Sequence, residues 1–273
     1  MSSKISNIYN LQDLDKQIKS QLKNANLDFS KTNAIYSDGI SGSGLSAQLA
    51  QLINLENLSI NLHKSNLEDT DVFELVNSLE KCQNLISLNI KLDTNHIGDE
   101  GASYLGNYLS KCSNLKYLNI DLWTNQINDQ GLLSLSQGIQ KCKNLRSLEL
   151  TLCENGFGNK GAIDLVTSIQ SCYNLKNLTI DFSLNSFAEQ FGFGLGTALA
   201  RLCYLTSLQL NLSNSQALDD TDCYDLCNLL AKNEHLIAIN LELQNNNCWY
   251  VTKKQLEVKF KKMKKLIKLN FSF

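Results

Sequence analysis

The cysteines are the first residues of this chain whose spacing raises a chemical question. Four of them recur at steps of thirty residues: Cys82, Cys112, Cys142 and Cys172. None has a second cysteine three positions away, the spacing that zinc sites and dithiol motifs use. In later copies of the pattern, the same position carries Leu202, Asn233 and Met263. A position that accepts leucine and methionine is a core position, so we predict buried, reduced thiols rather than a metal or redox site.

The other residue types that catalyse reactions or bind metals are scattered. Cys223 and Cys227 lie four residues apart on a predicted helix, and no further ligands accompany them. The three histidines, His63, His96 and His235, form no recognisable arrangement with a serine or cysteine nucleophile. These residues therefore predict neither a zinc site nor a catalytic triad.

Motifs that bind phosphate or activate a nucleophile are also missing. The glycine-rich stretch Gly192–Gly196 begins a predicted helix but follows an unusual strand, so we do not predict phosphate binding there. His-Glu-x-x-His, the Walker loop and Gly-x-Ser-x-Gly are absent. We predict that the chain is not an enzyme and uses no cofactor and no metal ion.

The composition narrows the class of protein further. The 273 residues carry 25 Lys and Arg against 27 Asp and Glu, and a net charge of −2 does not favour a nucleic-acid or membrane partner for the whole chain. Residues 1–10 lack the apolar segment of a signal peptide, and no apolar run approaches the roughly 18 residues of a membrane helix. We therefore expect a cytoplasmic protein with reduced cysteines and no membrane contact.

Two apolar patterns alternate along the chain and repeat every thirty residues. In residues 88–92, leucine and isoleucine alternate with polar residues, as they do in 118–122 and 148–152. This period of two predicts a strand with one buried face. In residues 102–112 the apolar spacing becomes three and four, which predicts a helix with one buried stripe.

A turn rich in asparagine separates each strand from the helix that follows. Asn95 and Asn125 are examples, and asparagine suits a turn because its side chain can bond nearby backbone groups. Asp99 and Asp129, a few residues later, are predicted to cap the helices that they precede.

One strand and one helix in each unit predict an α/β fold, a solenoid with the shape of a horseshoe. This βα solenoid would place a parallel sheet on the concave side and helices on the convex side. Adjacent strands lie about 4.8 Å apart, whereas packed helices need about 8–10 Å, so the stack must curve toward the sheet.

The repeat resembles the ribonuclease-inhibitor-like leucine-rich-repeat family. The matching pattern is Leu88-x-Ile90, then Asn95-x-Ile97-Gly-Asp-x-Gly101, and the resemblance covers about residues 52–273. Two extra residues between strand and asparagine depart from the family pattern and predict a longer strand. The array is similar to those expanded in ciliated protists, and the family implies a horseshoe that binds proteins.

The two ends of the array are predicted to differ. Residues 1–51 would hold a capping helix, with Leu11, Leu14, Ile18 and Leu22 on one face, and a degenerate first repeat. Residues 52–273 would hold the array of about thirty-residue units. The last strand leaves an open edge that could pair with another strand. A partner, a longer chain or the short length of the strand would prevent such pairing.

The polar residues of the strands form columns across the predicted concave face. The candidate partner-binding residues there are Lys91, Tyr117, Asn119, Asp121, Trp123, Glu149, Asp181 and Glu242. An exposed aromatic side chain beside carboxylates is a suitable anchor for a basic segment. The alternative is that Trp123 folds over the strand end and packs locally.

Lysines are concentrated in the last predicted helix and strand. They are Lys253, Lys254, Lys259, Lys261, Lys262, Lys264 and Lys265. Such a basic end would bind an acidic protein, RNA or anionic lipid. The absence of arginine weakens the nucleic-acid interpretation, and a solvated helix face is the alternative.

These features favour a non-catalytic protein–protein interaction module, a scaffold or a subunit of a larger assembly. Two alternatives stay open. One is a regulator of a small GTPase, for which only Arg146 and Arg201 supply arginines. The other is binding of nucleic acid or an acidic partner through the lysine-rich end.

Overall fold

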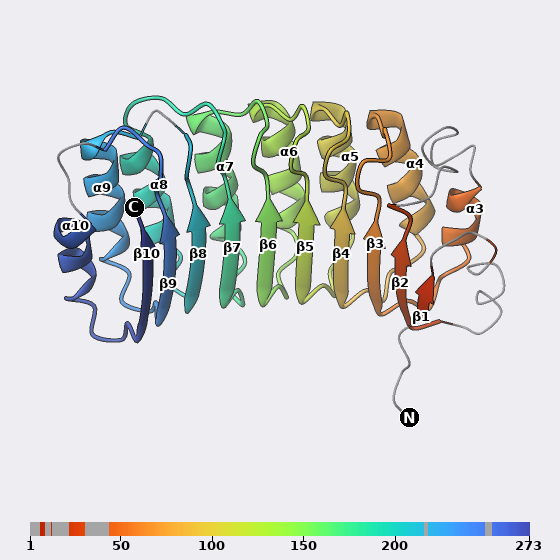
Figure 1. Cartoon of the computed structure of the whole chain (residues 1–273). Coiled ribbons are helices and arrows are strands. Elements are labelled where there is room, and N and C mark those ends of the chain that lie inside the picture. The colour runs from red at the N-terminus through yellow and green to blue at the C-terminus, as the bar shows by residue number, and fades with distance from the viewer. Residues whose placement is uncertain (1–5, 9–11, 13–21, 31–43, 216–217, 249–252) are drawn as a thin grey trace.

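One parallel sheet runs through the whole molecule. The computed structural model describes residues 6–8, 12, 22–30, 44–215, 218–248 and 253–273. In these residues ten strands follow one another in chain order, and each neighbouring pair is parallel (Figure 1). The strands are β1 (Ser6–Ile8), β2 (Asn24–Asp28), β3 (Asn57–Asn61), β4 (Ser87–Lys91), β5 (Tyr117–Asp121), β6 (Ser147–Thr151), β7 (Asn177–Asp181), β8 (Ser207–Asn211), β9 (Ala238–Glu242) and β10 (Lys268–Ser272).

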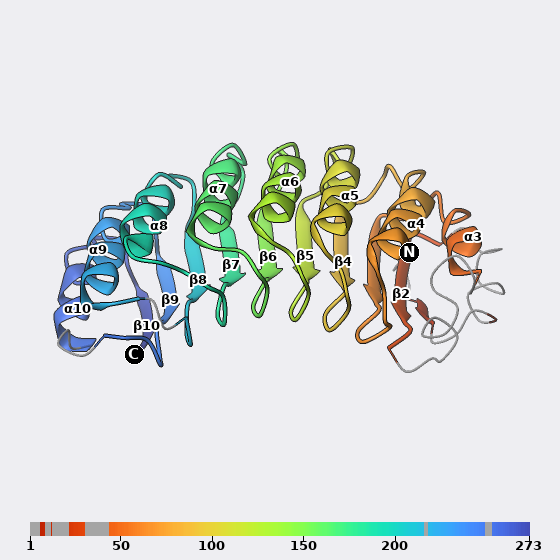
Figure 2. The same cartoon turned by 90° about the horizontal axis from the view of Figure 1, so that it is seen from above.

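The helices cover one side of this sheet. They are α3 (Leu45–Leu49), α4 (Asp69–Leu79), α5 (Asp99–Leu109), α6 (Asp129–Ile139), α7 (Asn159–Ile169), α8 (Phe191–Ala200), α9 (Asp220–Leu230) and α10 (Lys253–Phe260). Figure 2 shows a shallow arc with the helices on its outer side and the strands on its inner side. The predicted α/β horseshoe, with a concave parallel sheet and convex helices, is confirmed.

Equivalent residues of successive repeats stack directly on one another. Leu88 pairs with Leu118 and Ile90 with Ile120 across β4 and β5, and none of these four is more than 2% exposed. Together with the apolar stripes of the helices they form a continuous core. A thirty-residue step in sequence is therefore one step across the sheet, and polar residues outside the core line up in columns.

Bonding between repeats continues past the regular strands. The Leu92 N–H donates to the Asp121 carbonyl at 2.8 Å, and the Thr94 N–H donates to the Trp123 carbonyl at 2.7 Å. The longer strand that the sequence predicted is thus present as hydrogen bonding, although β4 itself ends at Lys91.

The asparagine side chains hold the turns together, as predicted. The Asn95 amide donates to the carbonyls of Leu62 and Leu92 at 3.1 and 2.8 Å, and its Oδ1 accepts from the N–H groups of Ser65 and Leu67, each at 3.0 Å. Side chains at the equivalent positions make corresponding bonds; they are Asn125, Asn155, Asn185 and Asn246. One side chain in a repeat therefore satisfies backbone groups of two turns.

The predicted helix caps were wrong, because the aspartates cap the next helix and not their own. Asp99 is the first residue of α5, whose N-cap is Gly98, and it caps the following helix instead of its own. Its Oδ1 accepts from the N–H groups of Asn128 and Gly131 at 2.7 and 3.0 Å, at the start of α6. A Cβ on Gly131 would lie 2.4 Å from that same oxygen, so the close approach requires glycine. The helices are capped across repeats because each lies beside the first turn of its predecessor.

The N-terminal residues extend the same sheet. The predicted degenerate strand is β2, in which Leu27 is buried, and Asn24 pairs with Asn57 of β3. Leu11, Leu14 and Ile18 of the predicted capping helix lie outside the described residues. The boundary between residues 1–51 and 52–273 stays a prediction.

Replacing Asp99 tests the cross-repeat cap. We expect Asp99→Ala to lower the free energy of unfolding by about 1–2 kcal/mol, because two N–H groups at the start of α6 lose their acceptor. Glu100→Ala removes the same charge from the same helical turn and should change the stability by less than about 0.5 kcal/mol. Urea denaturation with an unchanged m-value measures both. Equal losses in the two variants would contradict the cap.

Candidate functional site

The repeated cysteines occupy the core position that the sequence predicted. Cys82, Cys112, Cys142 and Cys172 are all at least 94% buried. Burial raises the pKa of the Cys142 thiol to about 12 and that of the other three to about 11. Their sulfur atoms donate to backbone carbonyls, for example from Cys142 to Leu109 at 3.3 Å. Neutral, bonded thiols of this kind are poor nucleophiles and poor metal ligands.

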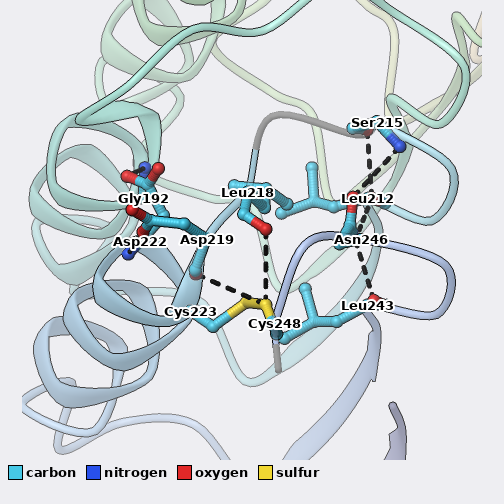
Figure 3. The surroundings of a disulfide bond; sticks show 10 residues. All are labelled: Gly192, Leu212, Ser215, Leu218, Asp219, Asp222, Cys223, Leu243, Asn246 and Cys248. Atoms are coloured by element: carbon cyan, nitrogen blue, oxygen red, sulfur yellow. Dashed lines mark hydrogen bonds between the residues drawn. A yellow bond between two sulfur atoms is a disulfide. The ribbon is translucent and has the colours of Figure 1, made fainter. Parts of the chain in front are cut away.

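One pair of cysteines contradicts the expectation that all are reduced. Cys223 of α9 forms a disulfide with Cys248, which lies in the loop after β9 (Figure 3). This loop folds back on the start of α9. There the Asn247 N–H donates to the Leu218 carbonyl at 2.9 Å, and Asn247 forms an isolated parallel β-bridge with Asp219. Cys248 lies outside the thirty-residue phase, so spacing gave no signal for the pair. Disulfides persist mainly in oxidising compartments, and the predicted cytoplasmic location stays untested.

The glycine-rich stretch does not offer an anion site. The Gly192 N–H at the start of α8 donates to the Asp222 carboxylate at 2.8 Å, so a side chain of the next repeat occupies the position that a phosphate would take. A Cβ on Gly192 would lie 2.0 Å from the Asp222 carbonyl oxygen. The glycine permits close packing of α8 on α9, and the prediction against phosphate binding is consistent with this arrangement.

No metal centre emerges from the described side chains. His63 bonds through Nδ1 to the Asp93 carboxylate, but no third ligand completes a group that could hold an ion. His96 borders a cavity of about 350 Å³ between the turns of three repeats, beside Lys64 and Thr124. His235 lies near the opposite edge of the molecule, in the loop before β9.

The structure separates the two aromatic residues that the sequence placed together. Tyr117 begins β5 and Trp123 lies two residues past its end, so the two are six positions apart, roughly 20 Å of extended chain. Tyr117 is 47% exposed and Trp123 is 41% exposed. The concave face therefore carries one aromatic side chain near each edge of the sheet.

Trp123 is fixed in place but not buried. Its indole N–H donates to Glu154 Oε2 at 3.1 Å, and the hydroxyl of Thr124 donates to the same oxygen at 2.8 Å. The Trp123 backbone N–H donates to Asp121 Oδ1 at 3.2 Å. The side chain thus packs locally, as one hypothesis expected, while keeping an exposed surface, as the other required.

Several carboxylates lie on the concave face, on the strand that precedes Trp123 or on the next two strands. Asp121 is partly buried, and that burial, only partly offset by the Trp123 N–H, raises the pKa of its carboxyl group. Asp181 accepts from the N–H and hydroxyl of Ser183 at 2.9 and 2.6 Å, so its position is fixed. Glu149 is exposed on β6, where it pairs in register with Asn119 of β5.

The outer members of the predicted surface lie farther along the sheet. Lys91 is exposed at the end of β4 and pairs in register with Asp121. Glu242 ends β9 and accepts from the Asn240 amide at 3.1 Å. The eight predicted residues share one face, and the structure leaves their contact with a partner as a prediction.

The lysines of the predicted basic end lie in α10 and in the loop that follows it, and their contact with a partner stays a prediction. Lys253 lies in the first turn of α10, 3.9 Å from Glu257, and Lys254 is exposed beside it. In the last turn, Lys259 Nζ lies 2.5 Å from the Tyr224 hydroxyl and 3.9 Å from the centroid of its ring. Four other lysines lie in the loop between α10 and β10; they are Lys261, Lys262, Lys264 and Lys265.

Both arginines lie away from the acidic region around Trp123. Arg146 precedes β6, and Arg201 follows α8. These positions add no support to the hypothesis of a GTPase regulator, which stays a prediction.

No family model matches the chain, and no curated protein matches it. Among solved structures, the chain is similar to an internalin C2 from Listeria monocytogenes, with 17% identity over 83% of this chain and 84% of that one, at a TM-score of 0.41. The leucine-rich-repeat fold stated above rests on the register and the thirty-residue period. None of the described helices is long and apolar enough to cross a membrane.

Burial and pKa together predict which thiols react. At pH 8 without reductant, iodoacetamide should label the exposed Cys203 first and leave Cys82, Cys112, Cys142 and Cys172 almost unmodified. With a pKa of about 11, roughly one thiol in a thousand is ionised at pH 8, before burial slows access further.

Peptide mass spectrometry after timed quenching measures these rates. The control is the same reaction in urea with reductant, in which all nine cysteines should react. Comparable native labelling of Cys82 and Cys203 would contradict the assignment of the repeated cysteines to the core.

Proposed function

We propose that this chain is a non-catalytic protein-interaction module, a ribonuclease-inhibitor-like leucine-rich-repeat array that serves as a scaffold or subunit of a larger assembly. The observation that carries the proposal is the exposed Trp123 on the concave face, which hydrogen bonds to Glu154 and Asp121 hold in place. Large aromatic side chains that stay exposed in the free protein are typical anchors of protein interfaces.

The partner segment should be basic. The polar columns near Trp123 contain Asp121, Glu149 and Asp181, whereas Lys91 is the nearby lysine in the same columns. A lysine or arginine of the partner could lie over the indole face and bond to the flanking carboxylates. Asn119, Tyr117 and Glu242 would contribute at the margins of the interface.

The rigidity of the surface supports binding of this kind. Glu154 accepts two hydrogen bonds from neighbouring side chains, and Trp123 is tied to it. The sheet beneath is fully paired from β4 to β7. Binding then immobilises few side chains, which lowers the entropy cost of association.

A substitution at Trp123 tests this function. Affinity capture with the full chain should identify a partner, and Trp123→Ala should weaken its measured Kd by about 30-fold or more, the equivalent of about 2 kcal/mol at a central aromatic anchor. Asp121→Asn should weaken it less, because one charge is lost and the shape remains.

The matched control is Phe193→Ala, which removes another exposed aromatic side chain, 55% exposed, from helix α8 on the convex side. It should leave the Kd within twofold. If Trp123→Ala and Phe193→Ala bind the partner equally, or if the chain retains no specific partner at all, the concave face is not the interface.

A further inference from the structure

The loops that lead from helices to strands share one edge of the sheet and carry most of the positive charge. This basic edge consists of residues 50–56, 80–86, 110–116, 140–146, 170–176, 201–206, 231–237 and 261–267, which lie at the bases of the strand arrows in Figure 1. It contains 13 Lys and Arg and only three Glu. The net charge of −2 therefore conceals a strong separation of charge.

The opposite edge has the reverse charge. The described loops from strands to helices, together with the first turns of the helices, hold 12 Asp and Glu against four Lys. All helices point the same way, so acids near their N-termini and bases near their C-termini are stabilising. This explains one row of cations directly after the helices: Lys81, Lys111, Lys141, Arg201, Lys232 and Lys262.

A second row of cations has no such explanation. Lys116, Arg146 and Lys176 directly precede β5, β6 and β7, several residues past the helix ends. They are consecutive in the sheet: the Arg146 N–H donates to the Lys116 carbonyl at 2.8 Å, and the Lys176 N–H donates to the Arg146 carbonyl at 2.9 Å. Lys176 Nζ donates to the Tyr204 carbonyl at 3.2 Å, but this contact does not account for cations at all three positions. Like charges on adjacent strands repel one another and lower stability, so the row as a whole favours an anionic ligand.

Exposed tyrosines interrupt the cations of the same edge. Tyr173 and Tyr204 are 59% and 47% exposed, and their ring centroids lie 5.9 Å apart. Lys143 Nζ lies 5.8 Å from the first ring and Lys176 Nζ 5.9 Å from the second.

Tyr204 replaces a structural asparagine. At the equivalent positions, the amides of Asn114, Asn144 and Asn174 donate to the preceding loop at 2.9–3.1 Å. The phenol side chain of Tyr204 has no amide to make this bond; it borders a cavity of about 310 Å³ that Lys265 also lines. A repeated stabilising contact has been exchanged for an aromatic surface beside cations.

We propose that the basic edge binds single-stranded nucleic acid. A line of cations along a row of parallel strands, about 4.8 Å per step, suits a linear polyanion better than the plane of a membrane. Tyrosine rings along this line can stack on the bases of a nucleic acid. An acidic peptide has no bases, so it would gain nothing from these rings. The site is separate from the concave surface around Trp123 and goes beyond the function proposed for it.

Salt dependence provides the first test. Fluorescence anisotropy of a labelled 20-nucleotide oligo(dT) with the full chain should show binding whose log–log salt slope is about −0.7 for each phosphate contact. Arg146→Glu with Lys176→Glu should reduce the slope by about 1.4 and the affinity at least tenfold at 0.1 M salt. Lys253→Glu with Lys254→Glu, the same charge change on the acidic edge, should leave the affinity within twofold.

A second pair of variants separates nucleic acid from other polyanions. Tyr173→Leu with Tyr204→Leu should weaken oligo(dT) binding about tenfold and leave binding of poly-glutamate unchanged. Circular dichroism and the thermal midpoint verify that every variant is folded, and Trp123→Ala should bind oligo(dT) normally.

Several results would overturn the proposal. The first is that oligo(dT) does not bind at 50 mM salt. The second is that poly-glutamate competes as well as unlabelled oligo(dT) and the tyrosine substitutions have no effect. The third is that the chain binds phosphatidylserine vesicles more tightly than oligo(dT). The chain could also form dimers at low salt that oligo(dT) fails to dissociate. That result would mean that the basic edge binds the acidic edge of a second copy of the chain.

Discussion

The hydrogen bonds of the turn asparagines are the interaction on which the rest of the structure depends. Asn95 bonds the carbonyls of Leu62 and Leu92 and accepts from the turn of the preceding repeat, so it joins two turns that would otherwise leave buried backbone groups unpaired. The same bonds recur at Asn125, Asn155 and Asn185, and the strands from β3 to β8 pair at a constant step of thirty residues. The concave columns and both charged edges follow from that constancy.

This repetition is also why so much of the fold could be predicted from the sequence. When residue 88 stacks on residue 118, a thirty-residue phase becomes a spatial coordinate, and the face of a strand residue follows from its position in the repeat. The buried cysteine position was predicted in this way from the leucine and methionine that replace cysteine in other copies. The eight concave residues were placed on one face by the same argument, without any knowledge of which of them contact a partner.

The missed features depend on contacts between repeats or on departures from the phase. Asp99 satisfies the local rule for a cap, and only its position beside α6 shows that it caps the next helix. Cys248 lies in a loop outside the repeat pattern, so no periodicity predicts its disulfide with Cys223. The C-terminal lysines are close in sequence, but α10 places Lys253 and Lys254 in its first turn and Lys264 and Lys265 in the loop beyond its end.

The direction of the elements connects stability with recognition. Since every strand and every helix of the stack points the same way, acids at helix N-termini and bases at C-termini accumulate on opposite edges without cancelling. Trp123 lies at the end of β5 that faces the acidic edge, and Tyr117 lies at the end that faces the basic edge. A basic protein segment and an anionic strand would therefore approach different edges, and neither would have to displace the other. The physical requirement that aligns the repeats thus also supplies the charge separation that would allow the two proposed partners to bind at once.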